Sequence, residues 1–197
     1  MQMIRNARTI RVMSAFAIAL LFPPVATLAS QSPELSTSDQ KALADFGKSS
    51  KDYVDKEHSL EASKMKPTSD VAKLEQQRKQ LRDAVQQSRP NAKQGDLFTP
   101  DVARVFRKIL ANLLNGPDGS KIKSSLNHAE PGAPAQFKVN GEFPNRNGQP
   151  IQSVPPTLLK VLPSLPKGLD YCIAGNALAL RDSSANMVVD FLPNALP

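Results

Sequence analysis

The chain has few of the residues from which disulfide, metal and nucleic-acid sites are built. Its 197 residues include one cysteine, two histidines and no tryptophan. The single Cys172 excludes an intramolecular disulfide. His58 and His128 lie too far apart in the chain for common metal-ligand spacings, and both are expected to be exposed. Two tyrosines and eight phenylalanines make a poor platform for base stacking. We therefore assign no metal, cofactor or nucleic-acid site.

Recognisable catalytic motifs are missing as well. The sequence contains neither a Gly-x-Ser-x-Gly elbow nor a glycine-rich phosphate loop. Carboxylates cluster at Asp52, Asp55 and Glu57, which we interpret as ordinary helix surface, and at Asp182 and Asp190. Asp182 is expected to open a loop and to cap the turn with its side chain. We assign no catalytic residue and expect that the protein is not an enzyme.

The charge balance also argues against nucleic acid as a partner. The formal net charge of +7 includes three arginines that lie before residue 12, and no acidic residue precedes Glu34. Without those arginines, 22 basic residues stand against 18 acidic ones, a net charge of +4. This excess is too small for a typical nucleic-acid-binding surface.

Residues 1–29 have the order of a secretory signal peptide. Three arginines are followed by the apolar run Val12–Phe22, the pair Pro23-Pro24 and small residues up to Ala29. Cleavage after Ala29 would leave Ser30 as the first residue. A membrane anchor is the alternative, but the apolar run is short for a spanning helix of ~20 residues and is followed by two prolines. We expect a periplasmic or secreted protein with no stable membrane anchor after cleavage.

Residues 30–93 predict a polar helical arm. A helix from Ser38 to about Lys64 is capped by Ser36 and Asp39, and Pro67 ends it. A second helix is expected from Ser69 to Arg89. Apolar residues are sparse on both helices, so we expect a loosely packed hairpin that buries little. Such a hairpin could be a solvated scaffold or could bind a partner through its apolar stripe.

Residues 94–197 predict a small α+β domain around one apolar core helix. Thr99 caps this helix, Pro100 occupies its first position, and Asn115-Gly116-Pro117 ends it. Its apolar residues recur at helical spacing: Val102, Val105, Phe106, Ile109, Leu110, Leu113 and Leu114. A membrane-surface helix would have a similar pattern, but a core helix is the more common cause.

Shorter elements are expected between the core helix and the C-terminal strands. A short helix is predicted at 120–126. Asn140-Gly141 within residues 137–143 predicts a hairpin with very short strands. Pro155-Pro156 opens another short helix, which Pro163 must end.

The C-terminal segment predicts a three-stranded antiparallel meander. Gly175-Asn176 suits a type II′ turn between strands 170–174 and 177–181. The resulting pairs are Ala174 with Ala177, Ile173 with Leu178, Tyr171 with Leu180, and Asp170 with Arg181. Cys172 then faces away from Tyr171 and Ile173, among small residues, and we expect it to be buried and unreactive.

A third strand is expected at residues 186–192. A four-residue loop would pair Met187 with Leu180 and Val189 with Leu178, with Phe191 on the same apolar face. A five-residue loop would pair Val188 with Leu180 and Asp190 with Leu178, which wastes this face. We favour the shorter loop, with the helix that Thr99 caps covering the sheet.

The segment LPKGLDYCIAGNALALRDSSANMVVDFLP resembles the C-terminal meander of small exported bacterial proteins, most of them uncharacterised. A Leu-Pro, a Tyr, a hairpin, an Asp and a terminal Val-Val strand recur in that group. A more distant likeness is to periplasmic nickel/cobalt homeostasis proteins. The resemblance carries over no catalytic residue.

These observations predict an α+β fold made of a polar N-terminal helical hairpin, one apolar core helix and a small three-stranded antiparallel sheet. The expected function is that of an exported, non-enzymatic interaction or adaptor protein of the bacterial cell envelope, with a protein partner. One alternative is an envelope stress or metal-homeostasis accessory protein. Another is a hydrolase with dispersed active-site residues.

Overall fold

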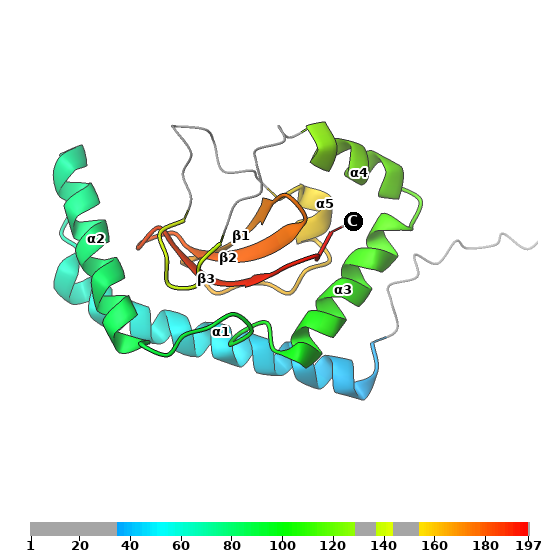
Figure 1. Ribbon diagram of the computed structural model, residues 1–197, viewed down its shortest axis with the longest axis horizontal. Coiled ribbons are helices and arrows are strands. Elements are labelled where there is room, and N and C mark those ends of the chain that lie inside the picture. Colours follow the sequence, from blue (N-terminus) through cyan, green and yellow to red (C-terminus); the bar gives the residue numbers. More distant parts are fainter. Residues whose placement is uncertain (1–34, 129–136, 144–153, 197) are drawn as a thin grey trace, which may run out of the picture. The chain divides into compact units, whose positions relative to one another are not determined.

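The computed structural model describes residues 35–128, 137–143 and 154–196, and within them it has an α+β fold (Figure 1). The predicted leader, residues 1–29, lies outside the described residues. The described elements, in chain order, are α1 (Thr37–Lys64), α2 (Val71–Ser88), α3 (Pro100–Leu114), α4 (Gly119–His128), α5 (Pro156–Leu159), β1 (Leu169–Ala174), β2 (Ala177–Asp182) and β3 (Met187–Leu192).

Helix α1 begins with the predicted cap, and ion pairs join it to α3. The Ser36 hydroxyl accepts the amide of Asp39, and the Asp39 carboxylate accepts the amide of Ser36. Asp39 also accepts hydrogen bonds from Arg104 at 2.6 Å and Lys108 at 3.0 Å. These two cations hold the pKa of Asp39 well below its usual range. One residue therefore caps α1 and joins it to α3.

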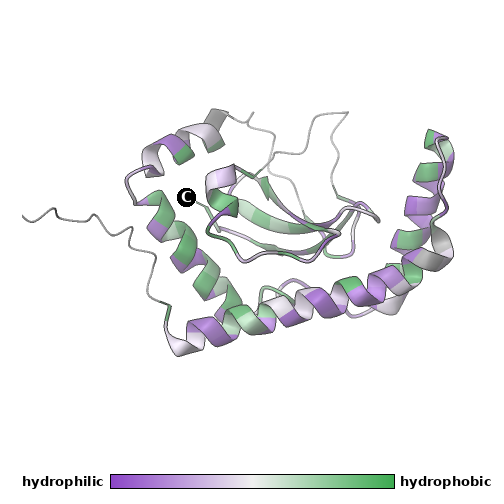
Figure 2. Cartoon of the chain, turned by 180° about the vertical axis from the view of Figure 1, so that it is seen from behind, coloured by the Kyte–Doolittle hydropathy of each residue, from purple (hydrophilic) through white to green (hydrophobic). Residues whose placement is uncertain are grey.

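The prediction that the first two helices bury little is wrong. Phe46 of α1 and Leu81 of α2 are exposed by only 1% and 0%, and both belong to the apolar cluster that includes α3 and the sheet. In Figure 2, hydrophobic and hydrophilic residues alternate along both helices. A narrow apolar stripe is enough here, because α1 packs against both α2 and α3. Among the described helices, none has the length and hydropathy needed to cross a bilayer.

Helix α3 is the core helix that the sequence predicts. The Thr99 hydroxyl caps it, Pro100 is its first residue, and Asn115 follows its last turn. Its apolar face is buried, and Phe106 contacts Phe46 with ring centroids 5.0 Å apart. Phe106 also lies 6.2 Å from the ring of Tyr171 in β1, so α3 packs against the sheet as expected. The short helices α4 and α5 are also present.

The β1–β2 register is confirmed. The pairs are Ala174 with Ala177, Ile173 with Leu178, Tyr171 with Leu180, and Asp170 with Arg181. Gly175 has a φ of 58°, as the first central residue of a type II′ turn requires. Asp170 and Arg181 lie opposite each other but do not form an ion pair. The Arg181 guanidinium instead donates to Asn186 Oδ1 at 2.8 and 3.1 Å.

The β2–β3 register differs from both sequence alternatives. Asp182 pairs with Met187 and Arg181 with Val188, after which a β-bulge shifts the pairing so that Leu180 faces Asp190. Val189 falls at the bulge, between the residues that pair with Arg181 and with Leu180. Met187 and Val189 still join the main apolar cluster, as predicted.

Beyond the bulge, the faces of β3 are exchanged relative to the prediction. Leu192 joins the main cluster, and Phe191 packs on the opposite face with Cys172 and Val188. The bulge turns Asp190 toward the segment before α3, where its carboxylate accepts three backbone amides: Gly95 at 3.0 Å, Leu97 at 2.8 Å and Phe98 at 2.8 Å. These bonds explain why the regular register is abandoned.

Residues 137–143 do not form the predicted hairpin. The Lys138–Gly141 turn is present, with a 2.8 Å hydrogen bond, and Asn140 takes a φ of 61°. The residues after the turn do not return to residues 137–139; they run beside β3, where Glu142 bridges to Met187. The Asn–Gly pattern therefore predicted the turn correctly. The strand that pairs with the residues after the turn is β3 and not residues 137–139.

Candidate functional site

A pocket of about 300 Å³ opens between α1, α2 and the segment that connects α2 to α3. Its floor is apolar and is made by Tyr53, Leu60, Val85 and Leu97. Around this floor lie polar and charged residues: Ser49, Asp52, Lys56, Glu57, Ser88, Arg89 and Asp96. Apolar floors with a few polar groups around them are typical of binding sites. Sequence reasoning missed this pocket because it predicted that α1 and α2 form a loosely packed hairpin with little buried between them.

The basic side of the pocket is built around Arg89. Its guanidinium carbon lies 5.0 Å from the centre of the Tyr53 ring, a cation–π arrangement. Arg89 also lies 3.9 Å from Asp96 and donates to Asn140 Oδ1 at 3.3 Å. Lys56 reaches across from α1 to the carbonyl of Ser88 at 3.3 Å. Both cations are therefore held at the boundary between α1 and α2.

Below the pocket, Tyr53 and Asp182 connect α1 to the sheet. The Tyr53 hydroxyl donates to Asp182 Oδ2 at 2.7 Å, and Asp182 Oδ1 accepts the amide of Ala185 at 2.8 Å. The second bond confirms that Asp182 caps its turn. Burial raises the pKa of both side chains. The Tyr53 hydroxyl therefore serves as a structural hydrogen-bond donor to Asp182.

Glu57 is the feature of this site that the sequence analysis misplaced. Asp52 and Asp55 are exposed and pair with Lys48 and Lys51, as helix-surface residues do. Glu57 is only 3% exposed, and its Oε1 is buried without a hydrogen-bond partner. Burial raises the pKa of Glu57 to about 8, and the carboxylates of Asp182 and Glu61 add to the rise.

The helical spacing of Glu57 could have indicated its burial. It follows Tyr53 by four residues and Val54 by three, so it continues the apolar stripe of α1. An acidic residue within such a stripe either lies at the exposed edge of the helix or is buried because its carboxyl group has a structural or functional role. Asp190 was missed too: its bonds to Gly95 and Leu97 position the segment that closes one side of the pocket.

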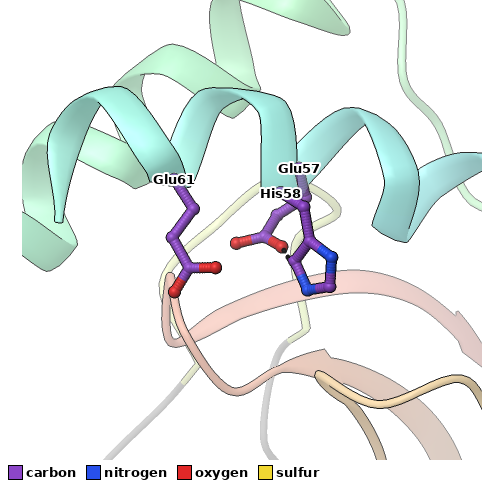
Figure 3. A group of neighbouring side chains, drawn as sticks. All are labelled: Glu57, His58 and Glu61. Atoms are coloured by element: carbon purple, nitrogen blue, oxygen red, sulfur yellow. Dashed lines mark ion pairs between the residues drawn. The ribbon is translucent and has the colours of Figure 1, made fainter.

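Next to the pocket, Glu57 groups with His58 and Glu61 on the same part of α1 (Figure 3). One ligand atom from each residue lies within 4.8 Å of the others. His58 Nε2 is 3.8 Å from Glu57 Oε2, and the His58 side chain is half exposed, as predicted. The sequence analysis assigned no metal ligand, so this group is an observation of the structure alone. The side chain of His128 lies outside the described residues.

Cys172 is buried and faces away from Tyr171 and Ile173, as the sequence predicts, but the expectation that only small residues surround it is wrong. It is 3% exposed and packs with Phe143, Ala179 and Val188 on the second face of the sheet. Burial raises the pKa of its thiol to about 12, which disfavours the reactive thiolate. Its burial is confirmed, and its lack of reactivity stays a prediction.

Comparisons with known proteins add no family to this geometry. The predicted resemblance of the C-terminal meander to exported bacterial proteins stays a prediction. No protein-family model matches the chain, and no curated protein and no solved structure is significantly similar to it.

Proposed function

We propose that this protein is an exported, non-enzymatic interaction protein of the bacterial cell envelope, and that it binds a protein partner in the pocket between α1 and α2. The observation that carries the proposal is the pocket's composition. Its floor is apolar, with Val85 1% and Leu97 5% exposed. Above this floor, acidic Asp52 and Asp96 and basic Lys56 and Arg89 are arranged around the opening.

This composition fits a segment of a partner protein that inserts one apolar side chain. Burial of that side chain supplies affinity, while charges of both signs around the opening select the flanking residues of the partner. The Arg89 side chain is already held over Tyr53, so little conformational freedom is lost on binding.

The hydrolase alternative has one observation in its favour. A buried carboxyl with a pKa of about 8, such as Glu57, is a common feature of acid–base catalysis. However, two of the three hydroxyl groups that line the pocket are used structurally. Tyr53 donates to Asp182, and Ser88 Oγ donates to the carbonyl of Val85 at 2.9 Å. We therefore favour a binding function over a catalytic one.

The test uses a photo-crosslinking amino acid at Lys56, which lines the pocket, and at Lys73, an exposed lysine of α2 outside it. We expect a discrete cross-linked partner in the cell envelope at position 56 and none at 73. The partner is then purified, and its affinity is measured. Lys56→Glu should weaken binding by at least ~10-fold, because it reverses one charge at the opening, whereas Lys73→Glu should not.

Equal cross-linking at both positions would contradict the proposed site, as would an affinity that Lys56→Glu leaves unchanged. Turnover of a substrate that depends on Glu57 would contradict the non-enzymatic role. A role in metal homeostasis requires a cation site, for which Glu57, His58 and Glu61 are the candidate group.

A further inference from the structure

Three potential metal ligands are close together near the C-terminal end of α1. His58 and Glu61 are three residues apart and therefore lie on neighbouring positions of one helix face. Figure 3 shows the Glu57 carboxylate between the His58 ring and the Glu61 carboxylate. The ligand atoms of the three side chains lie within 4.8 Å of one another. A Cβ atom added to Gly168, just before β1, would lie 3.9 Å from His58 Nε2, so the start of β1 is close to the group.

The buried carboxylate of this group has no complete set of partners. Glu57 is 3% exposed, its Oε1 has no hydrogen-bond partner, and its Oε2 has only His58 within ion-pair distance. Among the side chains that the structure describes, no lysine or arginine forms a salt bridge with Glu57, Glu61 or the nearby Asp182. A buried carboxylate without a complete set of partners destabilises the folded state unless it is neutralised or binds a cation.

We propose that Glu57, His58 and Glu61 form a binding site for a divalent transition-metal ion of the Zn²⁺ class. The imidazole nitrogen favours zinc, cobalt or nickel over calcium or magnesium, which prefer all-oxygen sites. The two carboxylates neutralise the charge of the ion. Three protein ligands leave a fourth position open, to which water or a donor group from another molecule binds.

The ligands need only a small closure around the ion. Bonds of 2.0–2.2 Å in a tetrahedral site place ligand atoms about 3.4 Å apart. Side-chain rotation of His58, which is half exposed, and of Glu61 can supply this movement while Glu57 stays in place. The site lies beside the pocket and shares Glu57 with it, but the inference does not depend on the proposed partner binding.

The experiment is calorimetric titration of ZnCl₂ into the purified protein after treatment with a chelator. We expect one equivalent of Zn²⁺ to bind. His58→Gln and Glu61→Gln should each weaken binding at least ~10-fold, because even indirect partners of metal ligands have effects of this size. Co²⁺ should give the visible absorption of a site with four or five ligands, and this absorption should be lost in both variants.

The controls are Glu75→Gln, which removes an exposed carboxylate paired with Arg78 on α2, and His128→Gln, which removes the other histidine. Both controls should bind Zn²⁺ as the wild type does, and circular dichroism should show that all four variants are folded. Absence of Zn²⁺ binding would overturn the proposal. So would unchanged affinity in either the His58 or the Glu61 variant, or an equal loss in a control. Because Lys56 and Lys73 are unchanged here, failure of this test leaves the partner-binding proposal intact.

Discussion

At the level of single residues, the burial of Cys172 predicts an unreactive thiol. Phe143, Ala179 and Val188 pack around its thiol, and burial raises the pKa of the thiol to about 12. We expect the native protein to react slowly with a thiol reagent at neutral pH and rapidly only in denaturant. Cys172→Ala should cost about 1 kcal/mol of stability and leave any cellular phenotype intact. Rapid labelling without denaturant, or loss of function in the alanine variant, would show that the thiol is active.

Glu57 should make the metal-free protein less stable as pH rises. Its pKa is about 8 in the folded state, whereas an unfolded glutamate titrates near 4.3. Between these values the folded state binds more protons than the unfolded state. The free energy of unfolding should therefore fall with increasing pH, by at most about 1.4 kcal/mol per pH unit. The raised pKa of Asp182 acts in the same direction.

Urea unfolding between about pH 5 and pH 8, in the presence of a chelator, measures this dependence. The side chain at position 57 stays neutral in the Glu57→Gln variant throughout this range. The free energy of unfolding of the variant should therefore vary less with pH, and it should rise relative to that of the wild type as the pH approaches 8. Identical pH profiles for the two proteins would mean that Glu57 titrates as an ordinary exposed carboxyl.

At the level of elements, Asp190 links the last strand to the segment that closes the pocket. Asp190→Ala would leave the amides of Gly95, Leu97 and Phe98 without their acceptor, two of them in fully buried bonds. We expect a loss of about 3 kcal/mol or more in the free energy of unfolding, measured in urea. As a comparison, Asp52→Ala at the exposed surface should change stability by about 0.5 kcal/mol or less. Similar values for both variants would show that these bonds contribute little.

The strand pairings show what sequence reasoning can and cannot reach. A two-residue turn permits only one register between its flanking strands. The pairing of Ile173 with Leu178 therefore followed directly from Gly175-Asn176. The pairing of β3 depends instead on Asp190, whose partners lie more than ninety positions earlier in the chain. No pattern within residues 186–192 indicates those amides, so the bulge was not predictable. The pocket escaped prediction for the same reason, since Arg89 and Tyr53 meet only through tertiary packing.

At the level of the whole molecule, helices and sheet share one core. Truncation to alanine of Leu110 in α3 or of Leu180 in β2 should cost about 2–5 kcal/mol, because each leaves a buried cavity. Leu81→Ala in α2 should fall in the same range, since Leu81 is fully buried. Leu74→Ala on the same helix should cost clearly less, because Leu74 is only partly buried. Urea denaturation of the four variants tests this, and equal losses at all four positions would contradict the assignment of the core.

The proposed cellular location depends on the predicted leader, residues 1–29. We expect the exported protein to begin at or next to Ser30, which intact mass or N-terminal sequencing would show. A membrane-bound product that retains Val12–Phe22 would contradict cleavage and would support the membrane-anchor alternative.

The hydrogen bond between Tyr53 and Asp182 also bears on the order of events during folding. Its two residues are 129 positions apart, so at ordinary synthesis rates they emerge on the order of ten seconds apart. Throughout this interval α1 lacks the strands against which Tyr53 packs, and Phe46 and Leu81 lack part of their common core. Contacts of such long range slow folding, because the intervening chain must be ordered before they form. The nascent helices therefore stay accessible to chaperones until the last strands are made.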